Sequence, residues 1–284
     1  MSVAGRESTV RLDRLTIRTI VPHPGPPRSI KGFRLAADTR VRSQTNVTTY
    51  KRVRTFHGIT SGTKVYWQHQ PNCCWLAPGR VTLVGTDETG LTPREIARIF
   101  KSCSIDSPAL VELAFDFGPK SGVNSGFVKR YGVFGKSRRR RNRGGVGQLR
   151  FGARRSGKLV RCYWKDTLKS YRVELEMHWP LLKKHGIVSI KQLSELPEIV
   201  QPQHLQFVTL RWKALKRLLI QRFGTDATQH LQETKQRWRS SLKHAERYLS
   251  HCGVMNVHRY RKPLLINRKI RNALKRWAYN FAEE

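Results

Sequence analysis

Apolar side chains occupy every second position in several short stretches of the chain. This period of two is typical of β-strands that bury one face against a core. The stretches cover residues 45–58, 64–70, 79–85, 109–118 and 171–179. Residues 148–164 predict a β-hairpin that turns around Arg-Arg-Ser-Gly. The pattern predicts a sheet, preceded at residues 21–29 by a proline-rich segment without regular structure.

Other segments have the spacing of helices. Thr92 precedes Pro93 and an apolar stripe at Ile96, Ile99 and Phe100, as expected of an N-cap and the turns that follow it. After Pro180 the pattern becomes helical, with a short helix expected at residues 189–195. Two longer stripes consist of Val208, Trp212, Leu215 and Leu219, and of Ile270, Leu274, Trp277 and Phe281.

These elements predict an α+β fold, in which an antiparallel sheet is backed by helices and followed by a basic helical C-terminal region. A length of 284 residues allows one elaborated domain or two. We expect an N-terminal arm and entry strand at residues 1–60, a central domain at 61–187 and the basic helical region at 188–284.

The charge of the chain changes the picture. It contains 55 Lys and Arg against 19 Asp and Glu, a formal net charge of +36, which favours binding to a polyanion. Nucleic acid is the expected partner, because the sequence shows neither an apolar run of transmembrane length nor a signal peptide that would favour a membrane. The five cysteines form no Cys-x-x-Cys pair, so we expect reduced thiols in an intracellular protein.

The strongest basic signal lies between two strands. Residues 117–165 contain 15 Lys or Arg and no acid, and the run at residues 136–145 predicts a mobile loop. This segment is expected to contact nucleic acid phosphates, although a solvated loop or a localisation signal has the same composition. The candidate contacts are Arg138, Arg139, Arg140, Arg141, Arg143, Arg154, Arg155 and Lys158.

The few acids of the chain gather on the predicted strands. Alternation places Glu112 with Asp116 on one polar face, and Glu174 with Glu176 and His178 on another. If these strands are neighbours, up to four carboxylates share a face. Carboxylates so close together repel one another unless a cation neutralises them, and their hard oxygen atoms suit Mg²⁺ or Mn²⁺. Each pair of acids is also compatible with an ordinary solvated strand face.

A tyrosine follows the basic segment. Arg161, Tyr163 and Lys165 share one face of the hairpin strand that precedes the Glu-Leu-Glu strand. A metal-activated phosphodiester next to Tyr163 would allow the phenol to attack phosphorus, while Arg161 and Lys165 ease its deprotonation. The rival tyrosines are Tyr66, Tyr131 and Tyr171, and each aromatic ring is also compatible with a purely structural role.

The order of three motifs adds a resemblance. LVELAFDF, then LRFGARRSGKLVRCYWKD, then YRVELEMHWPLL resembles the core of the Rep_trans rolling-circle replication initiators of plasmids, and a similar layout occurs in the gene II proteins of filamentous phages. The resemblance covers roughly residues 60–195. In it Trp164 stands where the family often has Asp, and Glu112 replaces an Asp. The chain has no His-hydrophobic-His motif of the larger relaxase group.

The resemblance implies an endonuclease that nicks one DNA strand through a tyrosine and later rejoins it. Tyr163 would be the nucleophile, and Asp116, Glu174 and Glu176 would be ligands of Mg²⁺ or Mn²⁺. Residues 61–187 would then be the nicking domain and residues 188–284 a DNA-binding region. The expected partners are an origin-like duplex or hairpin and the single strand released by nicking, in the cytoplasm of a bacterial host. A homodimer and a host helicase are left open.

Two other functions fit the same residues. The chain is also compatible with a non-catalytic DNA- or RNA-binding protein, in which the acids only reduce the positive charge. It is equally compatible with a metal-dependent nuclease or transposase that uses water instead of tyrosine. Cleavage of DNA, and the presence of a covalent protein–DNA adduct, distinguish these possibilities.

Overall fold

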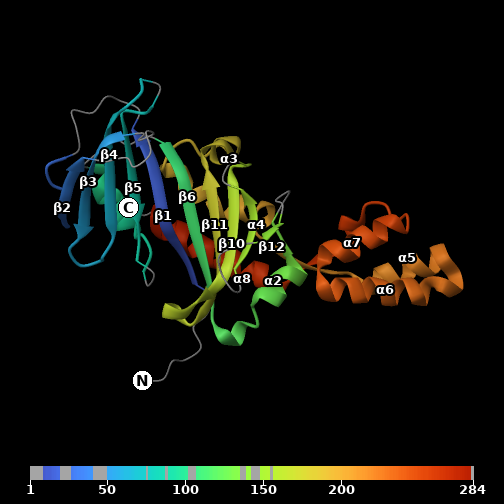
Figure 1. The fold of residues 1–284 in the computed structure, drawn as a ribbon. Coiled ribbons are helices and arrows are strands. Elements are labelled where there is room, and N and C mark those ends of the chain that lie inside the picture. The colour runs from blue at the N-terminus through green and yellow to red at the C-terminus, as the bar shows by residue number, and fades with distance from the viewer. Residues whose placement is uncertain are drawn as a thin grey trace.

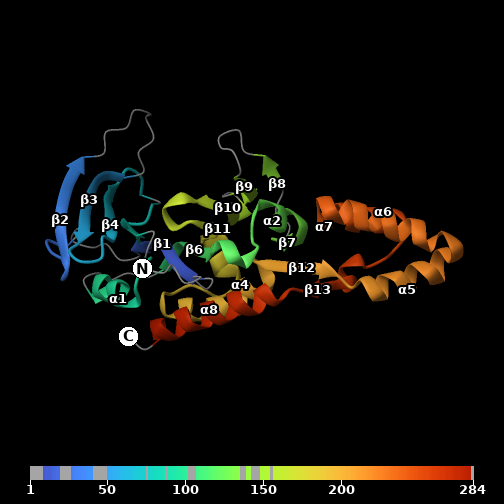
Figure 2. The ribbon, with the colours of Figure 1, turned by 90° about the horizontal axis from the view of Figure 1, so that it is seen from below.

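A large antiparallel sheet with helices on one face forms the body of the molecule, and a helical lobe projects from one end of it (Figures 1 and 2). This computed structural model describes residues 9–19, 27–40, 50–74, 76–86, 89–101, 107–134, 139–141, 148–153 and 156–282. The α+β class expected from the sequence is confirmed. None of the helices in these ranges is long and apolar enough to cross a membrane.

The large sheet has ten strands in the order β2-β3-β4-β5-β1-β6-β11-β10-β9-β8. In this order the strands are β2 (Phe33–Arg40), β3 (Tyr50–Gly58), β4 (Lys64–Pro71), β5 (Gly79–Val84), β1 (Thr9–Thr19), β6 (Ser107–Phe117), β11 (Ser170–His178), β10 (Lys158–Lys165), β9 (Leu149–Ala153) and β8 (Arg139–Arg141). Because β1 joins β5 to β6, the expected N-terminal arm contributes strands to the same sheet as the central domain.

The two faces of the sheet differ in chemistry. One face is apolar, because alternate side chains along β5, β6, β10 and β11, together with Leu15 of β1, join the main hydrophobic core. Leu15, Val111 and Met177 show the alternation: each is fully or almost fully buried, and Val111 is the register partner of both Leu15 and Met177. The opposite face carries the polar alternates. In Figure 1 it is turned toward the viewer, with α8 behind the strands.

Helices cover the apolar face, as Figure 2 shows from below the sheet. They are α1 (Pro93–Lys101), α3 (Trp179–Lys184), α4 (Leu196–Gln203) and α8 (Leu265–Ala282), together with a 3₁₀ turn at Lys191–Glu195. The first helix begins where the sequence predicts. The Thr92 hydroxyl accepts from the backbone N–H of Glu95, and the Glu95 carboxylate accepts from that of Thr92, which is a capping box.

The helical lobe has its own hydrophobic core, formed chiefly by Leu215, Leu219, Leu242 and Leu249. Its helices are α5 (Trp212–Phe223), α6 (Ala227–Ser240) and α7 (Leu242–His251). A small sheet lies at its base, between the lobe and α2 (Ser125–Tyr131), and has the order β13 (Arg261–Pro263), β12 (Gln206–Leu210), β7 (Gly132–Val133). The lobe is therefore an extension inserted between β12 and β13.

Most of the predicted strands and the last helix are confirmed, but two local predictions were wrong. Val208 lies in β12 and not on a helix with Trp212, because pairing with β13 and β7 holds residues 206–210 extended. Arg139–Arg141, predicted as part of a loop, forms the edge strand β8 against β9. The short helix expected at residues 189–195 is present as a 3₁₀ helix at Lys191–Glu195.

Candidate active site

Neighbouring strands bring the predicted acids onto one face of the sheet. β6 lies next to β11, and β11 lies next to β10. In the register of these strands, Glu112 is opposite Glu176, Asp116 is opposite Arg172, and Glu174 is opposite Arg161. Residues directly opposite each other on neighbouring strands point to the same face, and positions two or four apart along one strand do as well, so these side chains emerge together on the polar face. The sequence prediction that the three strands share a polar face is therefore correct.

Arg161 lies at the centre of three carboxylates. Its Nη2 atom hydrogen-bonds to Oε1 of Glu112 and is 3.1 Å from Oε1 of Glu176, while its Nε atom is 2.8 Å from Oε2 of Glu174. Arg14 approaches from β1, with Nη1 3.6 Å from Oε2 of Glu112. We call Arg161, Glu112, Glu174 and Glu176 the acid–arginine cluster. With Arg14 included, three carboxylates face two guanidinium groups.

Asp116 pairs with Arg172, which also reaches the cluster, with Nη1 3.9 Å from Oε1 of Glu174. Arg172 binds Asp116 through two atoms, with Nε 2.8 Å from Oδ1 and Nη2 3.0 Å from Oδ2. The Ser170 hydroxyl donates to the same carboxylate at 3.4 Å. This bidentate geometry fixes the Asp116 side chain strongly. The four carboxylates predicted to act together are therefore divided into a group of three and a single paired aspartate.

These acids are buried and do not lie on an open strand face as predicted. The exposed fraction is 4% for Glu112, 5% for Asp116, 4% for Glu174 and 0% for Glu176. The reason is that the neighbouring arginine side chains lie over the carboxylates and compensate their charge. Burial raises the pKa of Glu112 above its ordinary value, and Arg161 opposes that effect.

Tyr163 adjoins the cluster. Its hydroxyl donates a hydrogen bond to Oε1 of Glu174, the carboxylate whose other oxygen faces Arg161. The ring is partly exposed on the polar face. Burial, followed by this hydrogen bond, raises the pKa of Tyr163 well above its ordinary value. Lys165 follows on the same face at the end of β10 and is partly exposed.

The fit of this site to a metal ion was tested on its donor atoms. Within the described ranges, no three His, Cys, Asp or Glu side chains are arranged so that they could hold a metal. The guanidinium group of Arg161 lies among the carboxylates that were expected to surround a divalent ion. The Mg²⁺ or Mn²⁺ site stays a prediction.

A groove of about 540 Å³ runs along the polar face next to the cluster. Its lining includes Arg14, Arg80, Tyr66, Gln68 and His178, from β1, β5, β4 and β11. Two of these residues connect it to the cluster, because Arg14 faces Glu112 and the Nε2 atom of His178 is 3.3 Å from Oε2 of Glu176. Cationic, aromatic and amide side chains suit a strand of nucleic acid.

The rival tyrosines occupy other surroundings. Tyr171 lies on the apolar face with 4% of its surface exposed, and burial raises its pKa. Tyr131 lies on α2, where its ring contacts Trp238 edge to face at a centroid distance of 5.5 Å. Tyr66 lines the groove. Tyr163 differs from all three because it donates a hydrogen bond to a buried carboxylate of the cluster.

The predicted DNA contacts are placed only in part. Arg138, Arg143, Arg154 and Arg155 lie outside the described residues. Arg139, Arg140 and Arg141 form β8, the edge strand at the end of the sheet nearest β10. Lys158 was wrongly assigned to the contact surface. It is 8% exposed, and its ammonium group donates to the backbone carbonyl of Phe134, while burial lowers its pKa to about 8.

Sequence reasoning missed two residues that organise this face. Arg172 lies two positions before Glu174 and so shares its face, which the alternation alone could have revealed. Arg14 had no such signal, because its approach depends on the pairing of β1 with β6. The role of Arg161 also differs from the expected one: it neutralises carboxylates in addition to lying near the tyrosine.

Comparison with models of known protein families gives no match for this chain, and comparison with curated proteins finds no relative either. The function therefore has to be argued from the site.

Proposed function

We propose that this protein is a DNA strand-nicking and joining enzyme that initiates rolling-circle replication of a plasmid or phage, with Tyr163 as its nucleophile. The observation that carries the proposal is the hydrogen bond from the Tyr163 hydroxyl to the Glu174 carboxylate. A nucleophile and a base in contact, with the base held by a third group, is the arrangement that nucleophilic catalysis requires. Arg161 is that third group.

The raised pKa of Tyr163 explains why a base is needed. At neutral pH almost all of the phenol is protonated, so its proton has to leave as the new bond forms. In the proposed step, the Tyr163 oxygen attacks phosphorus, its proton passes to Glu174, and the bond from phosphorus to one ester oxygen breaks. That oxygen leaves as a hydroxyl after taking a proton from solvent. The phosphotyrosine ester keeps the phosphodiester linkage available for rejoining by the reverse step.

The surroundings support a polyanionic substrate. The chain has a formal net charge of +36, and the groove beside the cluster carries Arg14 and Arg80. At the cluster itself Arg161 pairs with Glu112, Glu174 and Glu176. A bound Mg²⁺ or Mn²⁺ ion would supply positive charge for the scissile phosphate, and Glu112 and Glu176 would hold it while Arg161 keeps Glu174 oriented as the base. We keep this ion as part of the proposal.

The test is the formation of a covalent protein–DNA adduct. Wild-type protein incubated with supercoiled DNA or an oligonucleotide and Mn²⁺ is expected to give nicked DNA with protein attached. Tyr163→Phe removes only the hydroxyl, so the adduct should disappear while DNA affinity remains. Tyr131→Phe is the matched control and should retain the adduct, because its ring packs far from the acid–arginine cluster, on the lobe side of the molecule.

Mass spectrometry of the peptide left on the cleaved strand identifies the nucleophile. An adduct on Tyr66 would keep the mechanism and refute the assignment to Tyr163. Free ends without an adduct would show a hydrolytic nuclease. Intact DNA at every divalent-ion concentration would favour the second candidate, a non-catalytic nucleic-acid-binding protein. The ion pairs between the buried carboxylates and arginine are the observation that supports that second candidate.

A further inference from the structure

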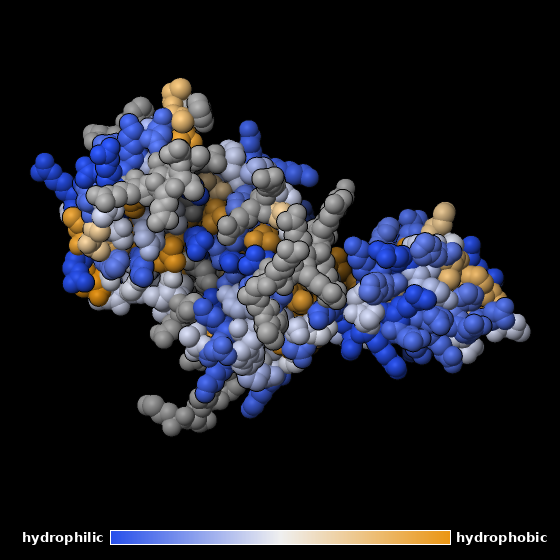
Figure 3. All heavy atoms as spheres, in the orientation of Figure 1, coloured by the Kyte–Doolittle hydropathy of each residue, from blue (hydrophilic) through white to orange (hydrophobic). Residues whose placement is uncertain are grey.

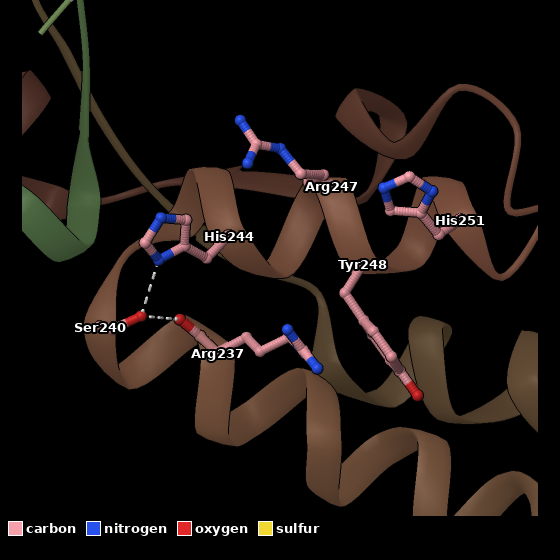
Figure 4. Close-up of a pocket in the computed structure, with 6 residues that line it drawn as sticks. All are labelled: Arg237, Ser240, His244, Arg247, Tyr248 and His251. Atoms are coloured by element: carbon pink, nitrogen blue, oxygen red, sulfur yellow. Dashed lines mark hydrogen bonds between the residues drawn. The ribbon is translucent and has the colours of Figure 1, made fainter.

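The helical lobe contains a pocket that the nicking site does not use. It lies between α6 and α7, has a volume of about 490 Å³, and is lined by Arg237, Ser240, His244, Arg247, Tyr248 and His251 (Figure 4). In the part of the chain that the structure describes, no carboxylate lines it. A concave site with two arginines, two histidines, a hydroxyl and an aromatic ring has the composition of an anion-binding site.

The helix geometry gathers these side chains. His244, Arg247, Tyr248 and His251 occupy positions i, i+3, i+4 and i+7 of α7, so their Cα atoms lie along one side of that helix. Arg237 reaches them from α6, with its guanidinium group 4.8 Å from the centre of the Tyr248 ring. This cation–π contact holds the arginine at the mouth of the pocket.

Hydrogen bonds fix the turn between the two helices. The Ser240 hydroxyl donates to the backbone carbonyl of Arg237 at 2.7 Å and lies 3.0 Å from Nδ1 of His244. Ser241 caps α7, with its hydroxyl accepting from the backbone N–H of His244. The positions of the lining residues are therefore set by the fold of the lobe.

Two acids lie near the pocket, and both are paired with arginines. Glu246 lies on α7 but binds Arg261, with Oε1 2.6 Å from Nε. Glu233 pairs with Arg237 at 3.4 Å, an exposed contact one helical turn away that contributes little. Over residues 212–251 the chain has nine Lys or Arg and three Asp or Glu. Figure 3 shows the resulting hydrophilic surface over the lobe.

We propose that the α6–α7 pocket binds a phosphate of the DNA backbone together with its sugar, and so forms a second DNA contact remote from Tyr163. The arginines supply charge-assisted hydrogen bonds to phosphate oxygens. The volume exceeds what a phosphate alone requires and leaves room for the attached sugar. The proposal rests on the proposed function only in the choice of DNA as the ligand.

The experiment compares two double variants of the full-length protein. Arg237→Gln with Arg247→Gln removes two charges from the pocket, whereas Lys216→Gln with Arg217→Gln removes two exposed charges from α5 of the same lobe. Fluorescence anisotropy with a labelled duplex of about 20 base pairs, and with one of its strands, measures affinity across a salt series. Loss of the one phosphate contact should make the slope of log affinity against log salt shallower by about 0.9 in the pocket variant.

The α5 variant should change the slope by less than half as much. Equal changes in the two variants would overturn the proposal, because they would show diffuse attraction to the whole lobe. The form of DNA with the larger loss identifies the ligand as duplex or single strand. A second pocket variant, Arg247→Gln with His251→Gln, leaves the Arg237–Tyr248 contact in place and should give the same result if the first variant unfolds.

Adduct formation separates this inference from the proposed function. At saturating concentrations of a short oligonucleotide, the pocket variants should still form the Tyr163 adduct, because the pocket contributes affinity and no chemistry. An adduct with an unchanged salt slope would refute the pocket alone. A reduced salt slope without any adduct, in wild-type protein or variants, would refute the nicking mechanism alone.

Discussion

At the scale of single residues, Arg161 compensates more carboxylates than one arginine usually does. Its side chain is 21% exposed, and its guanidinium group contacts three carboxylates that are almost fully buried. Removing one partner of a buried ion pair destabilises the fold by much more than the intact pair stabilises it, because the remaining charge is buried without compensation. The identity of this residue therefore matters to stability as well as to any chemistry at Tyr163.

We predict that Arg161→Met lowers the free energy of unfolding by roughly 3–5 kcal/mol at neutral pH. The loss should shrink as the pH falls. The pKa of Glu112 is already raised by burial, and removing Arg161 raises it further, so its ionisation in the folded state is unfavourable and protonation relieves it. Urea unfolding between pH 7.5 and pH 5 measures this, and a deficit that grows on acidification would contradict it.

The control is Arg150→Met. Arg150 is the register partner of Arg161 on β9, and its Nε atom donates to the Gln148 side chain and not to a buried carboxylate. That variant should lose much less stability.

Manganese gives a further readout of the same cluster. If the three carboxylates accept a divalent ion once the guanidinium group is absent, Mn²⁺ should raise the melting temperature of Arg161→Met more than that of wild-type protein.

At the scale of elements, two helices of the apolar face end against each other through histidines. His185 is the C-cap of α3 and His204 is the C-cap of α4, and their Nε2 atoms are 2.8 Å apart. One ring must donate and the other accept, so the contact requires at least one neutral imidazole. Burial, with Lys158 and His185 nearby, lowers the pKa of His204 to about 4.

We predict that this pair makes the protein sensitive to acid. A histidine whose pKa is lower in the folded state takes up its proton more readily when unfolded, so its stability contribution is complete above pH 6.5 and is lost as the pH falls toward 4. Between pH 7.5 and pH 5 the loss should be about 2 kcal/mol. His204→Gln should remove most of this pH dependence. His244→Gln, at an exposed position, should leave it unchanged.

The elements also show how far the sequence predicts this protein. Alternation located β6 and β11 and their polar residues, because a period of two survives wherever one face meets a core. It could not show that arginines from β1 and β10 would bury the acids, since that depends on strand order. Val208 was misassigned to a helix because it lies four residues before Trp212, the spacing of one helical face. The same spacing arises when a strand ends between the two residues and a helix begins at Trp212.

At the scale of the whole molecule, the lobe is separable from the sheet. β12 and β13 pair where the chain enters and leaves it, and the backbone N–H of Arg211 donates to the carbonyl of Tyr260 at 2.7 Å. The lobe core and the main core are separate clusters. Other contacts join the lobe to α2, such as the hydrogen bond from Nε of Arg130 to the backbone carbonyl of Arg239 at 3.3 Å.

We predict that replacing residues 212–259 with a short Asn-Gly turn leaves a folded sheet domain. It should melt a few degrees lower, because Val208, Leu210 and Tyr131 lose partners from the lobe. The shortened protein should still form the Tyr163 adduct on a short oligonucleotide, but with weaker binding to duplex DNA. Circular dichroism measures the fold and the melting temperature of the shortened protein, and the adduct assay measures its reaction with the oligonucleotide. Loss of the cooperative unfolding transition would show that the lobe is required for the fold.

The position of β1 has a consequence for the kinetics of folding. The strands β2 to β5 are neighbours in sequence as well as in the sheet, and can pair by closing short loops. β1 must instead pair with β6 across roughly 100 residues of chain. Closing this long loop costs conformational entropy before the two strands gain any free energy from burial. Leu15 is fully buried where β1 meets β6. Its φ-value, which reports how far its native interactions are formed in the folding transition state, should therefore differ from that of Phe56 on β3. Until β1 is in place, β5 and β6 each present an unpaired edge, and the interval before docking is when the chain is most exposed to intermolecular pairing.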